Sequence, residues 1–435
     1  MNFSQLKTIF SSNGCNRIYV KNLAPNDNSK NQVYFGGNFE ILNILPITEI
    51  ETVPQGDWEK ERFKAKIDFS WIKEDGTLTS APKSQLILYP KYPEVRFSGF
   101  LQGCKNAPSS LMRPRMVGRV LFLSVSNTGT VLGYVVPSES EIANEFNSIS
   151  GIKSYGIFKY FDLPVFQNNR QKLITELSRI HNLGWIKSKR LDACKNTLPC
   201  ESSNCGGYTL EAELGITPNG YSEPDYLGWE IKQFGVDKFT KINSKVITLM
   251  TPEPTNGFYK TDGAEAFIRK YGYPDVSGKQ DRMNFGGVHK NGVLHKKTNL
   301  TLQLIGFDSA KGKIRDSNGR IALLDENQNE TASWSFASML LHWNRKHNQA
   351  CYVPSISKID NGRNYQYGNQ IILGTGTDFL FFLKEMANGN IYYDPGIKLE
   401  QMSTKPKIKK RSQFRIVSKN LGNLYHSNEI IDITL

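Results

Sequence analysis

The sequence predicts a two-domain protein of the α/β (α+β) class. We expect a β-rich N-terminal domain over residues 1–160 and a mixed domain of strands and helices over residues 161–435. Three observations support this. A chain of 435 residues exceeds the usual size of one domain. Strand patterns dominate its first part, and helical spacing becomes prominent only after about residue 160.

Two local patterns indicate strands in the N-terminal domain. Between residues 64 and 71, polar and apolar side chains alternate, which predicts one half-buried strand. Residues 117–125 and 130–136 are apolar runs, and the sequence SNTG between them is typical of a hairpin connection. We therefore expect antiparallel pairing in this domain.

Helical spacing marks the second domain. Its first helix is predicted to end at Gly184, a C-cap residue, after apolar residues at helical intervals. Those residues are Leu173, Ile174, Leu177, Ile180 and Leu183. Ser333 is expected to N-cap a further helix that runs to about Lys346, and residues 379–386 form an apolar helix.

The composition limits which kinds of partner and which cellular setting the sequence suits. The net charge of +13 favours a polyanionic partner, and nucleic acid is the commonest one. A hydrophobic content of 39 % is enough for a sizeable core and argues against a largely disordered chain. No apolar run approaches the ~18–20 residues of a membrane span, and the N-terminus lacks the features of a signal peptide. We expect a soluble, cytoplasmic protein that does not act at a membrane.

The cysteines do not suggest a disulfide scaffold, since there are only six in the whole chain. Three of them, Cys194, Cys200 and Cys205, lie within twelve residues. Their spacing matches no established zinc pattern, so we expect reduced thiols in a loop, with zinc binding as the alternative.

The densest chemical signal is the sequence PDYLGWEIK at residues 224–232. In a strand, Glu230 and Lys232 project from the same face, while Ile231 points the other way into a core. Asp225 is an odd number of positions before Glu230, so a flat strand would place the two carboxylates on opposite faces. A bulge or bend must bring them together, and Gly228 is the residue that permits it.

These residue types suit phosphodiester hydrolysis. The transition state gains negative charge on the phosphorus oxygens, which a hard divalent cation neutralises. Mg²⁺ usually takes one or two protein carboxylates, and Asp225 and Glu230 meet that need, with Mn²⁺ able to substitute. Lys232 can hold or deprotonate the attacking water, or stabilise the pentavalent phosphorus. The alternative is a solvated hairpin with a Glu/Lys face, since the pattern alone is loose.

Glu211 is the fourth candidate, in the upstream sequence GGYTLEAELGI at residues 206–216. Thr209 is expected to N-cap a short helix that Gly215 closes, which places Glu211 in the first turn. A first-turn carboxylate is favoured by the helix dipole, and that stabilising role is the simplest interpretation. The functional interpretation is a further acidic or water-orienting group of the metal site.

Together these segments resemble the MvaI/BcnI family of type II restriction endonucleases, relatives of the mismatch-repair nicking enzyme MutH in the PD-(D/E)xK superfamily. The family shows a TLE segment, an NG turn and a PD…E-x-K strand in this order. The resemblance covers about residues 165–435 and is strongest over 184–254. It implies that Glu211, Asp225, Glu230 and Lys232 are catalytic, with Asp225 and Glu230 holding the metal.

The resemblance also implies a fold and a function. The fold is a restriction-endonuclease-like core, in which helices flank a mixed central sheet. The activity is site-specific, Mg²⁺-dependent cleavage of double-stranded DNA by a monomer, with protection supplied by a separate methyltransferase. A MutH-like nicking enzyme and a DNA-binding module with an inactive nuclease core remain as alternatives. Residues 1–160 have no counterpart in the compact family members.

Two basic clusters are candidates for DNA contact. The first lies between Met402 and Asn428, a stretch without acidic residues. Its candidates are Lys405, Lys407, Lys409, Lys410, Arg411 and Arg415. Arg415 could read guanine, and the others suit phosphates. The second cluster is Arg113 and Arg115 in the N-terminal domain, where a plain basic surface is the alternative.

Overall fold

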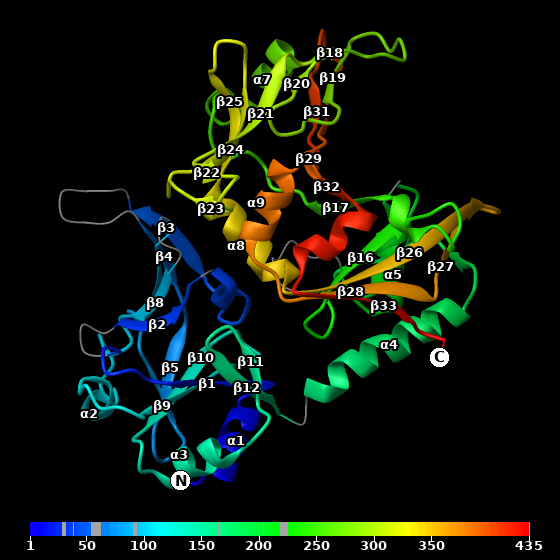
Figure 1. The fold of residues 1–435 in the computed structure, drawn as a ribbon. Helices are drawn as coiled ribbons and strands as arrows, with labels where there is room; N and C mark the ends of the chain where they lie inside the picture. The colour runs from blue at the N-terminus through cyan, green and yellow to red at the C-terminus, as the bar shows by residue number, and fades with distance from the viewer. Residues whose placement is uncertain are drawn as a thin grey trace. The chain divides into compact units, whose positions relative to one another are not determined.

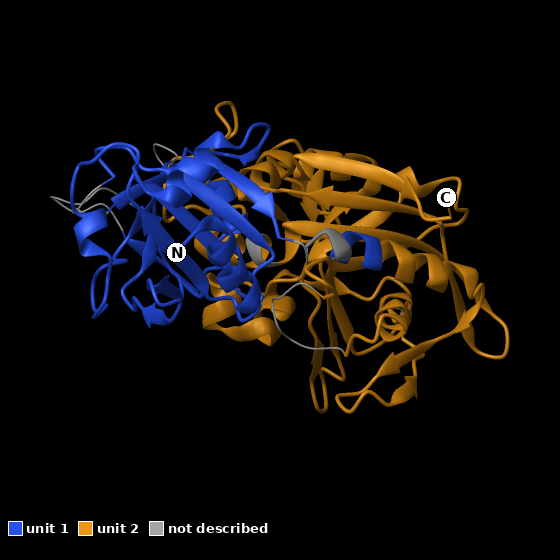
Figure 2. Cartoon of the chain, turned by 90° about the horizontal axis from the view of Figure 1, so that it is seen from below, with its two compact units in different colours: residues 1–172 blue, residues 173–435 orange. Residues whose placement is uncertain are grey.

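The computed structural model divides the chain into two compact units, residues 1–172 and 173–435 (Figure 2). We expected this boundary at residue 160. The residues that the structure describes are 1–27, 32–37, 39–53, 62–89, 94–163, 166–202, 204–217 and 225–434. No helix in these ranges combines the length and apolar character that a membrane crossing needs.

The first unit is rich in strands, as the strand patterns predicted, and its described strands form two sheets. The larger sheet has the order β11 (Lys153–Tyr155), β12 (Phe158–Asp162), β1 (Arg17–Asn22), β9 (Val120–Val125), β10 (Val131–Val136), β5 (Phe69–Ile72) and β6 (Leu78–Ser80). The smaller has the order β2 (Gln32–Gly36), β8 (Glu94–Ser98), β7 (Gln85–Tyr89), β4 (Arg62–Lys66) and β3 (Glu49–Val53). Its helices are α1 (Phe3–Ser12), α2 (Ser109–Met112) and α3 (Glu141–Ser148), with the 3-10 turn η1 (Phe39–Asn43).

One strand prediction in this unit is confirmed and one is wrong. Strands β9 and β10 pair as an antiparallel hairpin across residues 126–129. The single strand expected over residues 64–71 is instead two strands, β4 and β5, which belong to different sheets. The alternation continues through the break because Ala65 and Phe69 both face buried cores. A period of two reports burial, but it does not reveal that the chain passes from one sheet to another.

The second unit contains a mixed sheet. Its order is β13 (Ile186–Lys187), β27 (Arg363–Tyr367), β26 (Gln349–Ile359), β28 (Gln370–Thr375) and β33 (Ser427–Asp432). These strands pair antiparallel, whereas β16 (Glu230–Gly235) runs parallel to β26. Side chains of α4 (Phe166–Asn182) and α5 (Cys205–Glu213) share one apolar core with this sheet. The helix α8 (Phe336–His347) contacts β26 (Figure 1).

The other strands of the second unit form smaller sheets (Figure 1). One has the order β17 (Val246–Met250), β32 (Phe414–Val417) and β29 (Ile391–Tyr393), and the next β18 (Tyr273–Pro274), β19 (Arg282–Gly286), β30 (Gly396–Glu400) and β31 (Lys407–Lys409). A further sheet has the order β20 (Leu294–His295), β21 (Leu300–Ile305), β24 (Arg320–Leu324) and β25 (Glu330–Ser335). The two-stranded pairs are β14 (Lys189–Leu191) with β15 (Thr197–Pro199), and β22 (Phe307–Asp308) with β23 (Lys313–Ile314). The remaining helical segments are α6 (Phe258–Thr261), α7 (Gly263–Tyr271), α9 (Phe379–Ala387), η2 (Ile242–Ser244) and η3 (Ser418–Leu424).

Helix boundaries are confirmed in part. Gly184 follows α4 with a φ of 66°, as expected of a C-cap glycine. Helix α8 is capped by Ser335, whose side chain accepts from the backbone N–H of Ser338. The expected cap, Ser333, lies two residues earlier within β25 and is buried. The sheet pairing of Ser333 takes precedence over its capping propensity.

The expectation of reduced cysteines is wrong for one pair. Cys200 and Cys205 form a disulfide, with their Cα atoms 5.8 Å apart. The chain turns between β15 and the start of α5, which brings the two thiols together although neither belongs to a recognisable spacing pattern. Cys194 is exposed and unpaired. With two of the three cysteines joined to each other, the zinc alternative loses the ligands it requires.

Candidate active site

Strand β16 presents Glu230 and Lys232 on one face, as the alternation predicted. Ile231 points into the apolar core beneath α4 and α5. Glu230 is nevertheless buried, with only 4 % of its side chain exposed. A carboxylate is rarely held out of water without a charged or hydrogen-bonding partner, so this position calls for a chemical explanation.

A two-residue turn precedes β16. Tyr226 and Trp229 exchange backbone hydrogen bonds of 2.9 and 2.8 Å, which closes a tight hairpin around Leu227 and Gly228. Both central residues have positive φ values, 50° and 84°. Positive φ at both positions is the signature of a type I′ turn, in which glycine is favoured because it lacks a Cβ. The bend that we expected at Gly228 is confirmed.

The turn brings Asp225 and Glu230 to facing positions, one pair beyond the hydrogen-bonded pair. Side chains at such facing positions lie on the same side of a hairpin. An oxygen of Asp225 also accepts the backbone N–H of Ile231 at 3.0 Å, which fixes the carboxylate beside the start of β16. Pro224 and the preceding NG turn lie outside the described residues.

The position of Glu211 differs from the prediction. Helix α5 begins at Cys205, so Thr209 lies inside it, fully buried, and bonds the backbone of β14 instead of capping. Glu211 is therefore near the C-terminal end of the helix, where its own carbonyl accepts the N–H of Ile216 at 2.8 Å. Gly215, with φ of 73°, closes the helix as expected. Since the helix dipole disfavours a carboxylate at this end, the stabilising interpretation of Glu211 no longer holds.

The carboxylate of Glu230 is satisfied on one side only. Its Oε1 accepts a hydrogen bond from Lys232 Nζ at 2.8 Å. Its Oε2 is buried and has no hydrogen-bond partner within the described part of the chain. Buried polar atoms are normally paired, and an orphaned carboxylate oxygen is a position where a cation would be favourable.

Crowding of carboxylates shifts their proton affinities. Burial, and then the charges of Asp225 and Glu230, raise the pKa of Glu211 to about 7. Burial and the charge of Glu230 raise the pKa of Asp225 to about 6. Burial also acts to raise the pKa of Glu230, but the charges of Lys232 and Lys346 outweigh it and hold that pKa below its ordinary value. These couplings bring the four predicted residues into one electrostatic cluster.

Sequence reasoning missed Lys346, which belongs to the same cluster. Its Nζ lies 3.7 Å from Oε1 of Glu230. It comes from the last turn of α8, far from the motif in sequence, and a basic residue at a helix end carries no signal that points to an active site. The next residue, His347, is buried, and burial lowers its pKa to about 3. His347 is therefore neutral at physiological pH.

The cluster fits a divalent cation. Among the described residues, no three His, Cys, Asp or Glu side chains are gathered closely enough to hold a metal by themselves. Asp225 and Glu230 supply two carboxylates, and Oε2 of Glu230 is buried without a partner in the described part of the chain. Mg²⁺ takes its other ligands from water and phosphate. A positive charge there would also relieve the mutual repulsion that raises the pKa of Asp225.

Comparison with known proteins identifies the family of the chain. Residues 174–425, more than half of the chain, match the model of the MvaI/BcnI restriction endonuclease family. The chain belongs to this family. No curated protein matches the chain. Similar solved structures include the restriction endonuclease MvaI with its cognate DNA substrate, at 22 % identity and a TM-score of 0.45, and MvaI without DNA, at 20 % and 0.33. Each match covers 60 % of this chain and 97 % of MvaI, and such low TM-scores transfer no structural detail.

The family range includes the C-terminal basic segment down to residue 425. Lys405, Lys407, Lys409, Lys410 and Arg411 are all exposed, and the interleaved Phe414 and Ile416 are buried. The segment is thus ordered, with Lys407 and Lys409 on β31. Its charge is partly balanced by acids from elsewhere, since Lys409 pairs with Glu400 at 3.1 Å.

Arg415 bonds to side chains of its own unit. Its Nη1 lies 2.6 Å from a carboxylate oxygen of Asp394, and its Nε donates to Thr248 at 3.2 Å. Reading a guanine would require the guanidinium to leave Asp394. Arg113 and Arg115 of the first unit are exposed, whereas the neighbouring Arg119 is fully buried and donates to backbone carbonyls.

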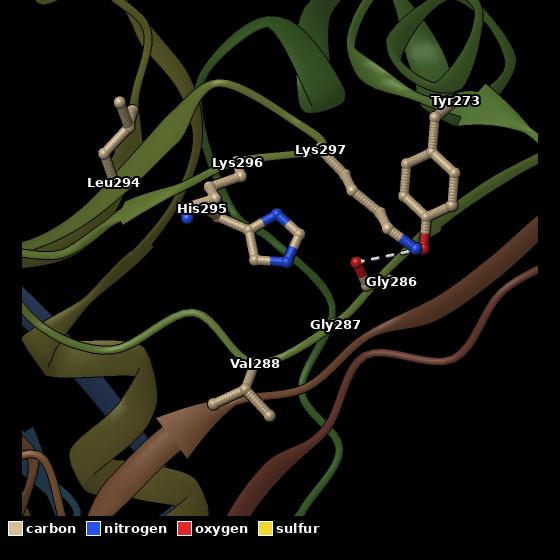
Figure 3. A pocket seen from close by; sticks show the side chains of 8 residues that line it. All are labelled: Tyr273, Gly286, Gly287, Val288, Leu294, His295, Lys296 and Lys297. Atoms are coloured by element: carbon tan, nitrogen blue, oxygen red, sulfur yellow. Dashed lines mark hydrogen bonds between the residues drawn. The ribbon is translucent and has the colours of Figure 1, made fainter.

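A concave region lies among the smaller sheets (Figure 3). Its volume is about 370 Å³, and the basic and aromatic groups that line it include Tyr273, His295, Lys296 and Lys297. His295 stacks on His289, and both rings bond the hydroxyl of Thr298 at 3.0 Å. Here the two histidines support each other structurally.

Proposed function

We propose that this chain is a type II restriction endonuclease: a site-specific, Mg²⁺-dependent enzyme that hydrolyses phosphodiester bonds of double-stranded DNA. The observation that carries the proposal is the buried carboxylate of Glu230, with one oxygen on Lys232 and the other without a partner. Membership of a restriction endonuclease family supports the same reaction class. The net charge of +13 suits a DNA partner.

Each residue of the cluster has a distinct task in this proposal. Asp225 and Glu230 hold Mg²⁺, or Mn²⁺ in its place. When bound, the metal neutralises charge that develops on the phosphate oxygens. Lys232 positions the attacking water, and Glu211 orients the same water. The water oxygen forms a bond to phosphorus and releases one of its protons to solvent. The bond from phosphorus to one sugar oxygen breaks, and that sugar oxygen takes up a proton from solvent.

The cellular setting follows from the activity. A restriction enzyme must spare its host's DNA, so a separate methyltransferase is the expected partner. We propose that the chain acts as a monomer in the cytoplasm and cuts the two strands in succession.

The test is incubation of plasmid DNA with the full chain and Mg²⁺, with Asp225→Asn as the inactive control. Discrete linear products support the proposal. A nicked circle as the final product would indicate a MutH-like nicking enzyme, and bound but uncut plasmid would indicate an inactive core. Sequencing the ends of digested genomic DNA would then give the recognition site.

A further inference from the structure

Two lysines, from different elements, face one oxygen of Glu230. Lys232 approaches from within β16 at 2.8 Å, and Lys346 approaches from α8 at 3.7 Å. Since both are cations, they repel each other, and one carboxylate oxygen cannot satisfy both ammonium groups fully. Lys346 is the more distant of the two. It is also the more exposed, at 29 % of its side chain against 16 % for Lys232.

The helix end that carries Lys346 is fixed in place. Trp343 is fully buried and its indole N–H donates to Thr377 at 3.1 Å. His347 stacks on Trp343 with ring centroids 4.1 Å apart, and its Nε2 lies 3.1 Å from the carbonyl of Leu249. The backbone at Lys346 is therefore held beside the carboxylate cluster, and 29 % of the Lys346 side chain is exposed.

The negative charges of the cluster favour a second lysine that can bind a DNA phosphate. Glu211, Asp225 and Glu230 together would repel a DNA phosphate. Lys232 already donates a hydrogen bond of 2.8 Å to Glu230. Lys346 lies farther from Glu230 than Lys232 does and is more exposed, so its ammonium can move from Glu230 to a phosphate oxygen at little cost.

We propose that Lys346 is a further catalytic residue, which binds a non-bridging oxygen of the scissile phosphate. This role rests on the proposed nuclease function and assigns the two lysines different partners: Lys232 serves the attacking water and Lys346 serves the phosphate. The competing explanation is structural, since a lysine in the last turn of a helix is favoured by the helix dipole.

The chain offers a matched control for that explanation. Lys384 is an exposed lysine in the last turn of α9. Lys384→Ala removes the same kind of helix-end charge at a position that the carboxylate cluster does not include. If Lys346 acts only through the helix dipole, Lys346→Ala and Lys384→Ala should have equal effects on melting temperature and none on cleavage.

The experiment uses the full chain, a duplex that contains the cleavage site, and the same duplex with an uncharged methylphosphonate at the scissile position. We expect Lys346→Ala to slow single-turnover cleavage about a hundredfold, and Lys346→Arg to restore most of the rate because the charge returns. In Ca²⁺, Lys346→Ala should bind the natural duplex about tenfold more weakly. The methylphosphonate duplex should bind the variant and the wild type equally.

Two results would overturn the assignment. One is an unchanged cleavage rate in Lys346→Ala. The other is an equal loss of affinity for both duplexes, which would mean that Lys346 does not meet the scissile phosphate. If the wild-type chain itself cuts no DNA, the proposed function fails and this role fails with it, whereas cutting by the wild type and by Lys346→Ala at one rate overturns only the role of Lys346.

Discussion

Lys232 donates to one oxygen of Glu230 at 2.8 Å, and the second oxygen of that carboxylate is buried with no partner among the residues described. The Glu230 carboxylate is thus buried, with only one of its two oxygens hydrogen-bonded. Leaving a buried acceptor unsatisfied costs about 1–3 kcal/mol, so a ligand for that oxygen would be stabilising. This relationship makes the metal testable through stability as well as through cleavage.

Mg²⁺ should raise the melting temperature of the wild-type chain. A ligand present at about 100 times its dissociation constant adds about 2.7 kcal/mol to the free energy of unfolding. Glu230→Gln should show little or no Mg²⁺-dependent shift in melting temperature, because the charge that attracts the metal is gone.

Cleavage should require Mg²⁺ or Mn²⁺, while Ca²⁺ should support binding with little cutting. Full activity in excess EDTA would refute the metal mechanism.

Asp225→Asn and Lys232→Ala should both abolish cleavage, with opposite effects on DNA affinity. Asparagine keeps an oxygen that can accept from Ile231 and removes a charge that repels the phosphate, so binding should hold or tighten. Lys232→Ala removes a cation, so binding should weaken modestly. A gel-shift titration in Ca²⁺ beside a single-turnover digest in Mg²⁺ measures both. Near-normal cutting by Asp225→Asn would mean that the active site lies elsewhere.

Glu211→Gln should abolish or greatly slow cleavage and yet stabilise the metal-free chain at alkaline pH. The folded chain holds the proton of Glu211 up to a pKa of about 7, while the unfolded chain releases it near 4.5. The free energy of unfolding therefore falls as the pH rises through this window. At pH 8 we expect a gain of about 1–2 kcal/mol in the variant, since one pKa unit is worth about 1.4 kcal/mol and partial solvent exposure screens the charge.

The measurement is denaturant unfolding of wild type and Glu211→Gln in EDTA at pH 5 and pH 8. The advantage of the variant should be larger at pH 8. A loss of stability at both pH values, with normal turnover, would restore the view that Glu211 is only a structural helix residue.

Gly228→Ala should destabilise the chain by about 1–2 kcal/mol, because φ of 84° is unfavourable for any residue with a Cβ. The added Cβ would meet nothing closer than Gln349 at 3.9 Å, so the cost is conformational and not steric. Cleavage should fall as well, since this turn sets Asp225 opposite Glu230.

Gly207→Ala is the matched control for the turn. Gly207 lies inside α5 with no positive φ, and a Cβ there would have nothing within 4 Å. Alanine should stabilise this helix by about 0.5–1 kcal/mol and leave cleavage unchanged. Equal behaviour of the two substitutions, by thermal unfolding and digest, would argue against a special role for the turn.

The C-terminal basic segment should bind DNA phosphates. Lys409→Ala combined with Lys410→Ala should weaken binding to every DNA sequence alike and reduce the salt slope by about 0.9 for each lysine–phosphate pair removed. Arg415→Ala should mainly lower stability, because Arg415 is paired with Asp394. A loss of about 1–3 kcal/mol on the cognate site alone, with relaxed specificity at one position, would instead identify Arg415 as a base reader.

Local interactions made part of this protein predictable from sequence. The alternation of Glu230, Ile231 and Lys232 follows from strand geometry, and it survives in the structure because burial of Ile231 fixes which face the charges take. Gly228 and Gly215 were predictable for the same kind of reason: each occupies a backbone conformation that glycine adopts with little strain. The family resemblance rests on this same local sequence.

Tertiary interactions decided the rest. Thr209 has the chemistry of an N-cap, yet it is buried within α5 because its hydroxyl bonds the backbone of β14, and this moves Glu211 to the other end of the helix. Strands β4 and β5 are two separate strands because this one alternating segment contributes to two different sheets. Lys346 joins the cluster only because α8 ends beside Glu230. The sequence by itself determined the motif, its faces and its turn, since those depend on neighbours along the chain. Only the folded structure decided which distant charges meet the motif, because packing and long-range pairing outweigh local preference.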